Sequence, residues 1–339
     1  RHGRPQCCGN ATCVPICPIQ AKYDATAHLL RAERAGAHVE PQAVVHRLVP
    51  GAGGRIASVK FLRPDRSAGE AQGRFVVIAA HTIETPKLLL MSTSPDMPNG
   101  VANSSGQVGR NLMAQIDVGV RGLARDPMFT YRGPVSTGGI REYRDGDFRG
   151  EYGALGMSPT NEGWERATGP ITAAVMFIKQ GLRGDALKSA IRHHVARQVL
   201  IGTSTEMLPD ADNRVTPSAT AMDGLGIPRP SIRFKYGDYA TKGHAMARKI
   251  QNDIMAQLGA TEVKQLGPVC DSAIMGGTAR MGDDPASSVV DKNLRAHDHE
   301  NLYIVGSAVF PTITPMAPTL SIGALSARLG AHLLEKAKS

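Results

Sequence analysis

Four of the five cysteines of this 339-residue chain lie in one short segment, CCGNATCVPICP. These cysteines, at positions 7, 8, 13 and 17, are too closely spaced to form two comfortable disulfides, because bridged cysteines need Cα atoms about 5–6 Å apart. Thiolates bind iron–sulfur clusters and zinc, and a loop with glycine and proline can turn several sulfurs toward one centre. The spacing therefore favours a metal site.

The kind of metal follows from what surrounds the cysteines. Zinc sites usually combine two C-x2-C pairs, or one such pair with two histidines, and this sequence supplies no second half. Cys17 is followed by Pro18, as in loops whose last cluster ligand precedes a proline. An iron–sulfur cluster is the favoured interpretation, and zinc, disulfides and free thiols are the alternatives.

Two strands with following helices are expected to position a second site. The apolar segment FVVIAA (75–80) is typical of a fully buried strand, and it runs directly into HTIETPKLLLMS, which predicts a helix with Pro86 near its first turn. Near the other end, NLYIVGSAVFPT predicts a strand and a turn before a long helix that begins at Pro318. Doubly wound sheets bind nucleotides where a strand ends and a helix begins, although an ordinary strand–helix unit is the simpler alternative.

Other elements are predicted from periodicity. Helices are expected at 21–36, 183–200 and 239–258, and strands joined by a glycine-containing hairpin are expected between 38 and 80. The segment 126–178 is rich in glycine and shows no firm period. Together the segments indicate a mixed α/β fold.

Composition excludes several classes of protein. The hydrophobic fraction of 42% and the charged fraction of 20% are those of a globular chain. The net charge of +9 comes from scattered Lys and Arg without interleaved aromatics, so nucleic-acid binding is not predicted. No apolar run reaches the ~18 residues of a membrane span, so membrane association is expected only through a partner. The sequence begins at Arg1 without a signal peptide, and we expect a longer native chain.

Several segments in order resemble the glucose–methanol–choline (GMC) oxidoreductases. They are VVIAAHTIETPKLLLMS, SGQVGRNLMAQ, TEMLPDADNRVTPSATAMDGLGIPRPSIRF, GGTARMGDDPASSVVD and NLYIVGSAVFPTITPMAPTLSIGALSARLGAHLL. More closely, they are similar to the large flavin subunit of the dehydrogenase complexes that oxidise gluconate, sorbitol, fructose or glucose. The resemblance spans nearly the whole chain.

This resemblance implies a role for the cysteines. The large subunits carry a cysteine loop that holds a 3Fe-4S cluster beside the flavin, and here Cys7, Cys13 and Cys17 would be the ligands, with Cys8 as the spare. Hydride reaches a flavin as two electrons, and a one-electron centre can pass them on singly toward a haem partner.

The resemblance also implies FAD as cofactor. The family's G-x-G-x-x-G fingerprint does not occur in this chain, so only part of the flavin site is expected. That part would lie mid-chain and in the tail, where the backbone N–H groups of the last helix could face the flavin. The expected contacts are Val45, Ala79, Ala80, Gly306, Ser307, Pro318 and Thr319.

The catalytic positions depart from the family's pattern. The family removes the hydroxyl proton with a His, assisted by a second His or Asn. Ala273 and Ile274 occupy the first position here, and Met316 and Ala317 occupy the second. Their side chains cannot accept a proton. The nearest substitutes in sequence are Asp271 and Ser272.

The predicted organisation is a cysteine loop at 1–20, a partial FAD-binding domain at 21–120 and 271–339, and a substrate domain with an antiparallel sheet at 121–270. The resemblance implies FAD-dependent oxidation of a sugar or polyol hydroxyl, with electrons passing through a 3Fe-4S cluster to a cytochrome or another acceptor. The alternative is a degenerate homologue that serves in electron transfer or assembly. The resemblance also implies a small subunit and a multihaem cytochrome c as partners, and with them a periplasmic location.

Overall fold

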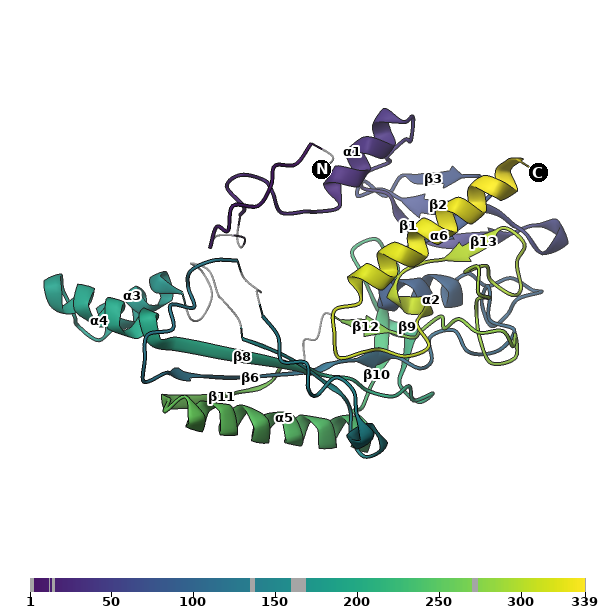
Figure 1. The fold of residues 1–339 in the computed structure, drawn as a ribbon. Helices are drawn as coiled ribbons and strands as arrows, with labels where there is room; N and C mark the ends of the chain where they lie inside the picture. The colour runs from purple at the N-terminus through teal and green to yellow at the C-terminus, as the bar shows by residue number, and fades with distance from the viewer. Residues whose placement is uncertain are drawn as a thin grey trace. The chain divides into compact units, whose positions relative to one another are not determined.

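The computed structural model describes residues 3–11, 13, 16–134, 138–159, 169–269 and 274–338. Its fold is mixed α/β, as the sequence predicted (Figure 1). The chain divides into two compact units, each assembled from three separate stretches of sequence. The first unit comprises Arg1–Val39, Ile116–Thr205 and Lys242–Asp271, and the second comprises Glu40–Gln115, Glu206–Thr241 and Ser272–Ser339.

The first unit is built on an antiparallel sheet, which confirms the predicted antiparallel sheet. Its strand order is β11-β6-β8-β7, and the strands are β6 (Ile116–Leu123), β7 (Leu155–Pro159), β8 (Gln198–Thr205) and β11 (Thr261–Val269). Helix α5 (Asp238–Gln257) follows one face of this sheet (Figure 1). There the buried amide of Gln251 donates to the Thr203 hydroxyl at 2.8 Å and to the Ile201 carbonyl at 3.2 Å, so the helix is fixed to the sheet by polar as well as apolar contacts.

The remaining helices of this unit differ in part from the prediction. They are α1 (Thr26–Arg34), α3 (Pro170–Lys179) and α4 (Gly184–Arg197), with a short 3₁₀ turn η2 (Asp147–Gly150). The helix predicted at 183–200 ends at Arg197, because Gln198 already pairs with Leu123 in the sheet. The irregular segment 126–178 contains β7 and most of α3. No helix in the described ranges has both the length and the apolar character needed to cross a membrane.

The second unit contains three small antiparallel sheets and one parallel pair. The antiparallel strands are β1 (Val44–Pro50), β2 (Ile56–Leu62) and β3 (Ala68–Ala71), then β5 (Met113–Ala114) with β12 (Met275–Gly276), and β9 (Arg214–Met222) with β10 (Pro228–Arg233). The parallel strands are β4 (Val76–Ile78) and β13 (Leu302–Ile304). The other elements are η1 (Ala52–Gly54), α2 (His81–Met91), η3 (Ser307–Val309) and α6 (Thr319–Lys338). The predicted hairpin, buried strand and tail helix are confirmed.

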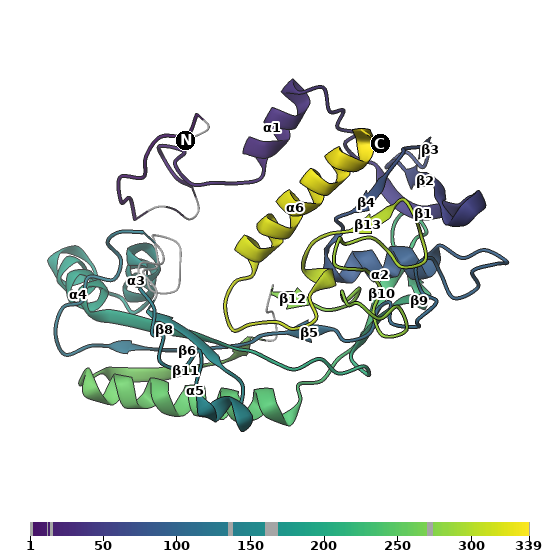
Figure 2. The ribbon, with the colours of Figure 1, turned by 45° about the vertical axis from the view of Figure 1, so that its right-hand side comes forward.

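Strand β13 lies at the centre of the core of this unit. Its three residues are fully buried, and α6 lies alongside it, contributing buried Leu329 (Figure 2). Asn301, just before β13, accepts a hydrogen bond from the Ile56 N–H at 2.8 Å and donates to the Ile56 carbonyl at 2.9 Å. This side-chain amide replaces a backbone ladder partner, so it joins β13 to β2.

Helix α2 contains a proline that is compensated by a neighbouring hydroxyl. Pro86 has no N–H to donate to the carbonyl four residues earlier, which belongs to Thr82. The hydroxyl of Thr278 donates to that carbonyl at 2.6 Å, and both threonines are fully buried. The start of α2 is therefore fixed by a residue almost two hundred positions away.

Candidate active site

The carboxyl ends of β4 and β13 form one edge that gathers four of the predicted contacts. The strands pair in parallel register, Val76 with Leu302 and Ile78 with Ile304, and the Val305 N–H donates to the Ile78 carbonyl at 2.9 Å. Ala79 and Ala80 follow β4 at this edge, and Gly306 and Ser307 follow β13. All four residues are small, so none of them places a bulky side chain at this edge.

Gly306 leaves open space at this edge of the sheet. Its φ of 108° is one that residues with a side chain rarely adopt, and a Cβ added there would meet no atom within 4 Å. The glycine therefore turns the chain into η3 without placing a side chain in the open space.

A buried pair of hydroxyls lies beside Gly306. The oxygens of Ser307 and Thr82 are 2.8 Å apart, and the Thr82 hydroxyl is also 3.2 Å from the Met275 carbonyl. A carbonyl can only accept, so Thr82 donates to Met275 and receives the Ser307 proton. This pair joins the start of α2, the start of η3 and β12.

Gln115 connects the two positions where the family's catalytic groups were expected. Its backbone N–H donates to the Ile274 carbonyl at 3.3 Å, and its side-chain amide donates to the Met316 carbonyl at 3.2 Å and to the Thr314 carbonyl. Tyr236 donates its hydroxyl to the Gln115 carbonyl at 3.2 Å. No motif or periodicity in the sequence marks Gln115, whereas the family pattern points to the positions of Ile274 and Met316.

These contacts give no proton acceptor at either position. Ile274 and Met316 present only backbone carbonyls to Gln115, whose own Oε1 is buried without a hydrogen-bond partner among the described residues. Asp271, Ser272 and Ala273 lie outside the described residues. The proposal that Asp271 or Ser272 acts as the base therefore stays a prediction.

The last helix begins at the other predicted tail contacts. Pro318 precedes α6, its carbonyl accepts the Ile322 N–H at 3.0 Å, and Thr319 is the first helical residue. The first N–H groups of a helix have no partner within it, and the helix dipole places partial positive charge there. Gln115 fixes the loop leading to this end of α6 through the carbonyls of Thr314 and Met316.

Val45 is placed differently from the other predicted contacts. It lies in β1 with its side chain 40% exposed, next to a register shift between Val45 and Arg47. Pairing in that sheet is with β2, not with the parallel strands. The β4–β13 edge therefore does not include Val45, and its contact stays a prediction.

The cysteine segment does not form a metal centre in the described structure. Cys7 and Cys8 are exposed, Cys13 and Cys17 are half-buried, and all four are free thiols. Backbone hydrogen bonds, chiefly from Lys22, lower the pKa of Cys17. Among the described residues no three Cys, His, Asp or Glu side chains converge as metal ligands. Because the residues do not present a formed site, we derive no electron-transfer step through a cluster.

Solved structures support the fold class. A formate oxidase variant from Aspergillus oryzae RIB40 has a TM-score of 0.63 at 14% identity, covering 92% of this chain and 63% of its own. Pyridoxine 4-oxidase from Mesorbium loti has a TM-score of 0.54 at 17% identity, covering 86% of this chain and 57% of its own. At these identities the likeness shows the fold alone.

Family comparison then defines the class. Residues 2–117 and 209–326 match the N-terminal and C-terminal family models described as GMC oxidoreductase. Together these ranges cover more than half of the sequence, and the chain belongs to the GMC oxidoreductase family, as its motifs predicted.

Two curated proteins are similar to this chain over nearly its whole length. The fructose dehydrogenase large subunit of Gluconobacter japonicus is 39% identical over 99% of this chain and 61% of its own length. The 6'''-hydroxyparomomycin C oxidase of Streptomyces lividus is 30% identical over 96% of this chain and 57% of its own length. The chain thus spans less than two thirds of the length of either relative.

Proposed function

We propose that this chain is part of an FAD-dependent dehydrogenase that oxidises a sugar or polyol hydroxyl. The observation that carries the proposal is the β4–β13 edge, where Ala79, Ala80, Gly306 and Ser307 follow two strands in register. Similarity to a fructose dehydrogenase large subunit supports the substrate class. When bound, the flavin would take up a hydride from the carbinol carbon.

The residues at the edge fit a flavin. The open space beyond Gly306 would be filled by any side chain at that position. Ser307 donates its hydroxyl proton to Thr82, and Thr82 donates to the Met275 carbonyl, so neither buried hydroxyl is left as an unpaired donor beside an incoming ring. The N–H groups at Thr319 would stabilise negative charge on a reduced flavin.

Proton removal is the open chemical step for this chain. The side chains of Ile274 and Met316 have no basic atom, so we propose that Asp271 or Ser272 takes the hydroxyl proton. The same absence of a base at both positions is the observation that favours the second candidate function. In that case the chain is a degenerate homologue that keeps the fold and serves in electron transfer or assembly.

We further propose a 3Fe-4S cluster, a small subunit, a multihaem cytochrome and a periplasmic location. The spacing of the four cysteines supports the cluster, and similarity to a protein named as a large subunit supports the partners. Iron and labile sulfide analysis of the native protein tests the cluster. Cys13→Ser should lower both, whereas Cys8→Ser, the matched control, should retain them. Zinc without sulfide would replace this part of the proposal with a zinc site.

The test of activity is an anaerobic absorption spectrum of the native polypeptide with fructose, glucose, gluconate or sorbitol. Bleaching of the visible flavin band by one of them supports the dehydrogenase. A bound flavin that dithionite bleaches and no substrate does would favour the degenerate homologue.

A matched pair of glycine variants tests the flavin position. Gly306→Leu should reduce the bound flavin, because its side chain would fill the open space. Gly226→Leu, at a turn with similar φ and open space, should retain the flavin. Equal flavin content in the two variants would contradict the assignment of the edge.

A further inference from the structure

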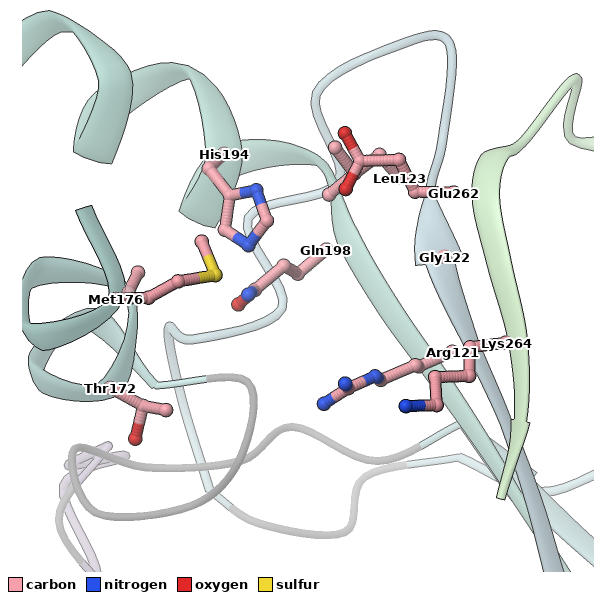
Figure 3. Close-up of a pocket in the computed structure, with 10 residues that line it drawn as sticks. Arg121, Gly122, Leu123, Thr172, Met176, His194, Gln198, Glu262 and Lys264 are labelled. Carbon is pink, nitrogen blue, oxygen red and sulfur yellow. The ribbon is translucent and has the colours of Figure 1, made fainter. Parts of the chain in front are cut away.

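A cavity of about 370 Å³ lies in the first unit, between the sheet and the helices α3 and α4. Residues from β6, β8 and β11 form one side, and residues from α3 and α4 form the other (Figure 3). None of its lining residues belongs to the β4–β13 edge. Its volume is in the range of small-molecule sites.

A β-bulge shapes the cavity wall. Thr261 pairs with Leu123 and Lys264 pairs with Arg121, so β11 advances three residues where β6 advances two. Glu262, within this step, has a φ of 53°. Left-handed backbone at a residue with a side chain is strained, and bulges redirect side chains. As a result both Glu262 and Lys264 line the cavity.

Two cations lie side by side at this wall. Arg121 and Lys264 are directly opposed across adjacent strands, and their side chains extend in the same direction (Figure 3). Like charges at such positions destabilise a sheet. Within the described ranges neither cation lies within ion-pair distance of a carboxylate. An anion between them would remove this repulsion.

Gln198 gives the cavity an unused acceptor. Its side chain lines the cavity and is only 7% exposed, and its Oε1 has no hydrogen-bond partner among the described residues. The residue itself is well fixed, because its backbone carbonyl accepts the Thr130 hydroxyl at 2.7 Å. A buried amide oxygen without a donor is unfavourable, and a ligand hydroxyl would supply that donor.

The rest of the cavity lining is partly apolar and partly polar. Met176 and Leu123 provide apolar contact, and His194 reaches the cavity from α4 with its ring packed edge-on against Phe177 at 5.3 Å. Burial is the main cause that lowers the pKa of His194, so the ring is neutral near pH 7 and can both donate and accept.

We propose that this cavity binds a small hydroxylated organic anion. Its carboxylate or phosphate lies between Arg121 and Lys264, and one of its hydroxyls donates to Gln198 Oε1. The two cations outnumber the Glu262 carboxylate that also lines the cavity, so the cavity favours an anion over a neutral sugar. The Gln198 amide favours a hydroxylated anion over a simple ion. The two head groups share this chemistry, and the experiment separates them.

Isothermal titration calorimetry of the native polypeptide at low salt tests the site, with gluconate, glucose 6-phosphate and neutral sorbitol as probes. We expect one of the two anions to bind and sorbitol not to compete with it. Arg121→Gln and Lys264→Gln should each weaken binding about tenfold. Lys60→Gln, which removes the same charge from an exposed position in β2, is the matched control and should leave the affinity unchanged.

Gln198→Leu separates a ligand role from a structural one. It should weaken anion binding while raising the melting temperature, because a buried amide whose Oε1 has no hydrogen-bond partner among the described residues is replaced by an apolar side chain of similar size. The proposal is overturned if neither anion binds, if the cavity variants bind as well as the parent, or if Lys60→Gln weakens binding as much as Lys264→Gln. Gluconate that binds only as a substrate at the β4–β13 edge would be insensitive to Arg121→Gln and Lys264→Gln, so these variants distinguish failure of this site from failure of the proposed function.

Discussion

Thr278→Val tests whether the Thr278 hydroxyl replaces the N–H donor that Pro86 lacks in α2. The change removes a hydroxyl that donates at 2.6 Å to the Thr82 carbonyl, and the two residues are 0% exposed. The change leaves the buried Thr82 carbonyl without this donor, which costs about 1–3 kcal/mol. Valine matches the shape of threonine, so no cavity adds to the loss. We expect the free energy of unfolding to fall by about 1–3 kcal/mol.

A double-mutant cycle tests whether the loss of stability in Thr278→Val depends on Pro86. In a Pro86→Ala background the alanine N–H can donate to the Thr82 carbonyl. Thr278→Val should then cost about 1 kcal/mol less than in the parent chain, a coupling that shared partners produce and distant sites do not.

Urea denaturation followed by circular dichroism measures the four proteins, and equal m values are required for the comparison. Thr220→Val, at an exposed position in β9, serves as control and should change stability by less than about 0.5 kcal/mol. Strict additivity of the two changes, or a loss at Thr278 no larger than at Thr220, would refute the reasoning.

Three further outcomes are expected. Burial lowers the pKa of His299, which is 2% exposed. As the pH decreases, the unfolded chain therefore binds a proton at this histidine before the folded chain does. The free energy of unfolding should decrease as the pH decreases below 6.5, by at most about 1.4 kcal/mol per pH unit. His299→Gln, whose amide oxygen can still accept the Ala102 N–H, should remove this part of the pH dependence in urea titrations. Gln115→Leu should speed amide hydrogen exchange at 311–318, because the Thr314 and Met316 carbonyls lose their common donor. Gln198→Leu should raise the free energy of unfolding by about 1 kcal/mol, and a decrease would contradict its unpaired state.

Elements with a strong local pattern were predictable from the sequence. Helix α5 begins at Asp238, one residue before its predicted start, and β4 and β13 occupy the two apolar segments that indicated buried strands. Because these strands pair in parallel, the small residues after each lie at the same edge of the sheet, and their contact with a nucleotide stays a prediction.

The polar residues that organise the second unit could not be found this way. Gln115, Asn301 and Thr278 act through carbonyls and N–H groups far away in sequence, and a single polar residue in an apolar stretch leaves no period to detect. Helix α3 was missed because PITAAVMFIK is apolar on nearly every face. The helix predicted to reach residue 200 ended early because sheet pairing overrode local preference at Gln198.

The cavity was equally invisible in the sequence. Arg121, Gln198 and Lys264 come from three strands, and their convergence depends on a bulge at Glu262 that no glycine marks. Only the pairing register shows that the two cations face each other.

The long separation in sequence between the paired segments affects how the chain folds during its synthesis. Ile56 and Asn301, which join β2 to β13, are 245 positions apart. A ribosome adds roughly 5–20 residues per second, so β2 and β4 emerge roughly ten to fifty seconds before β13. During that interval the apolar strand FVVIAA lacks β13, its pairing partner among the described residues, and an unpaired strand edge of this kind can aggregate. The nascent chain should therefore depend on chaperones until its last segment arrives.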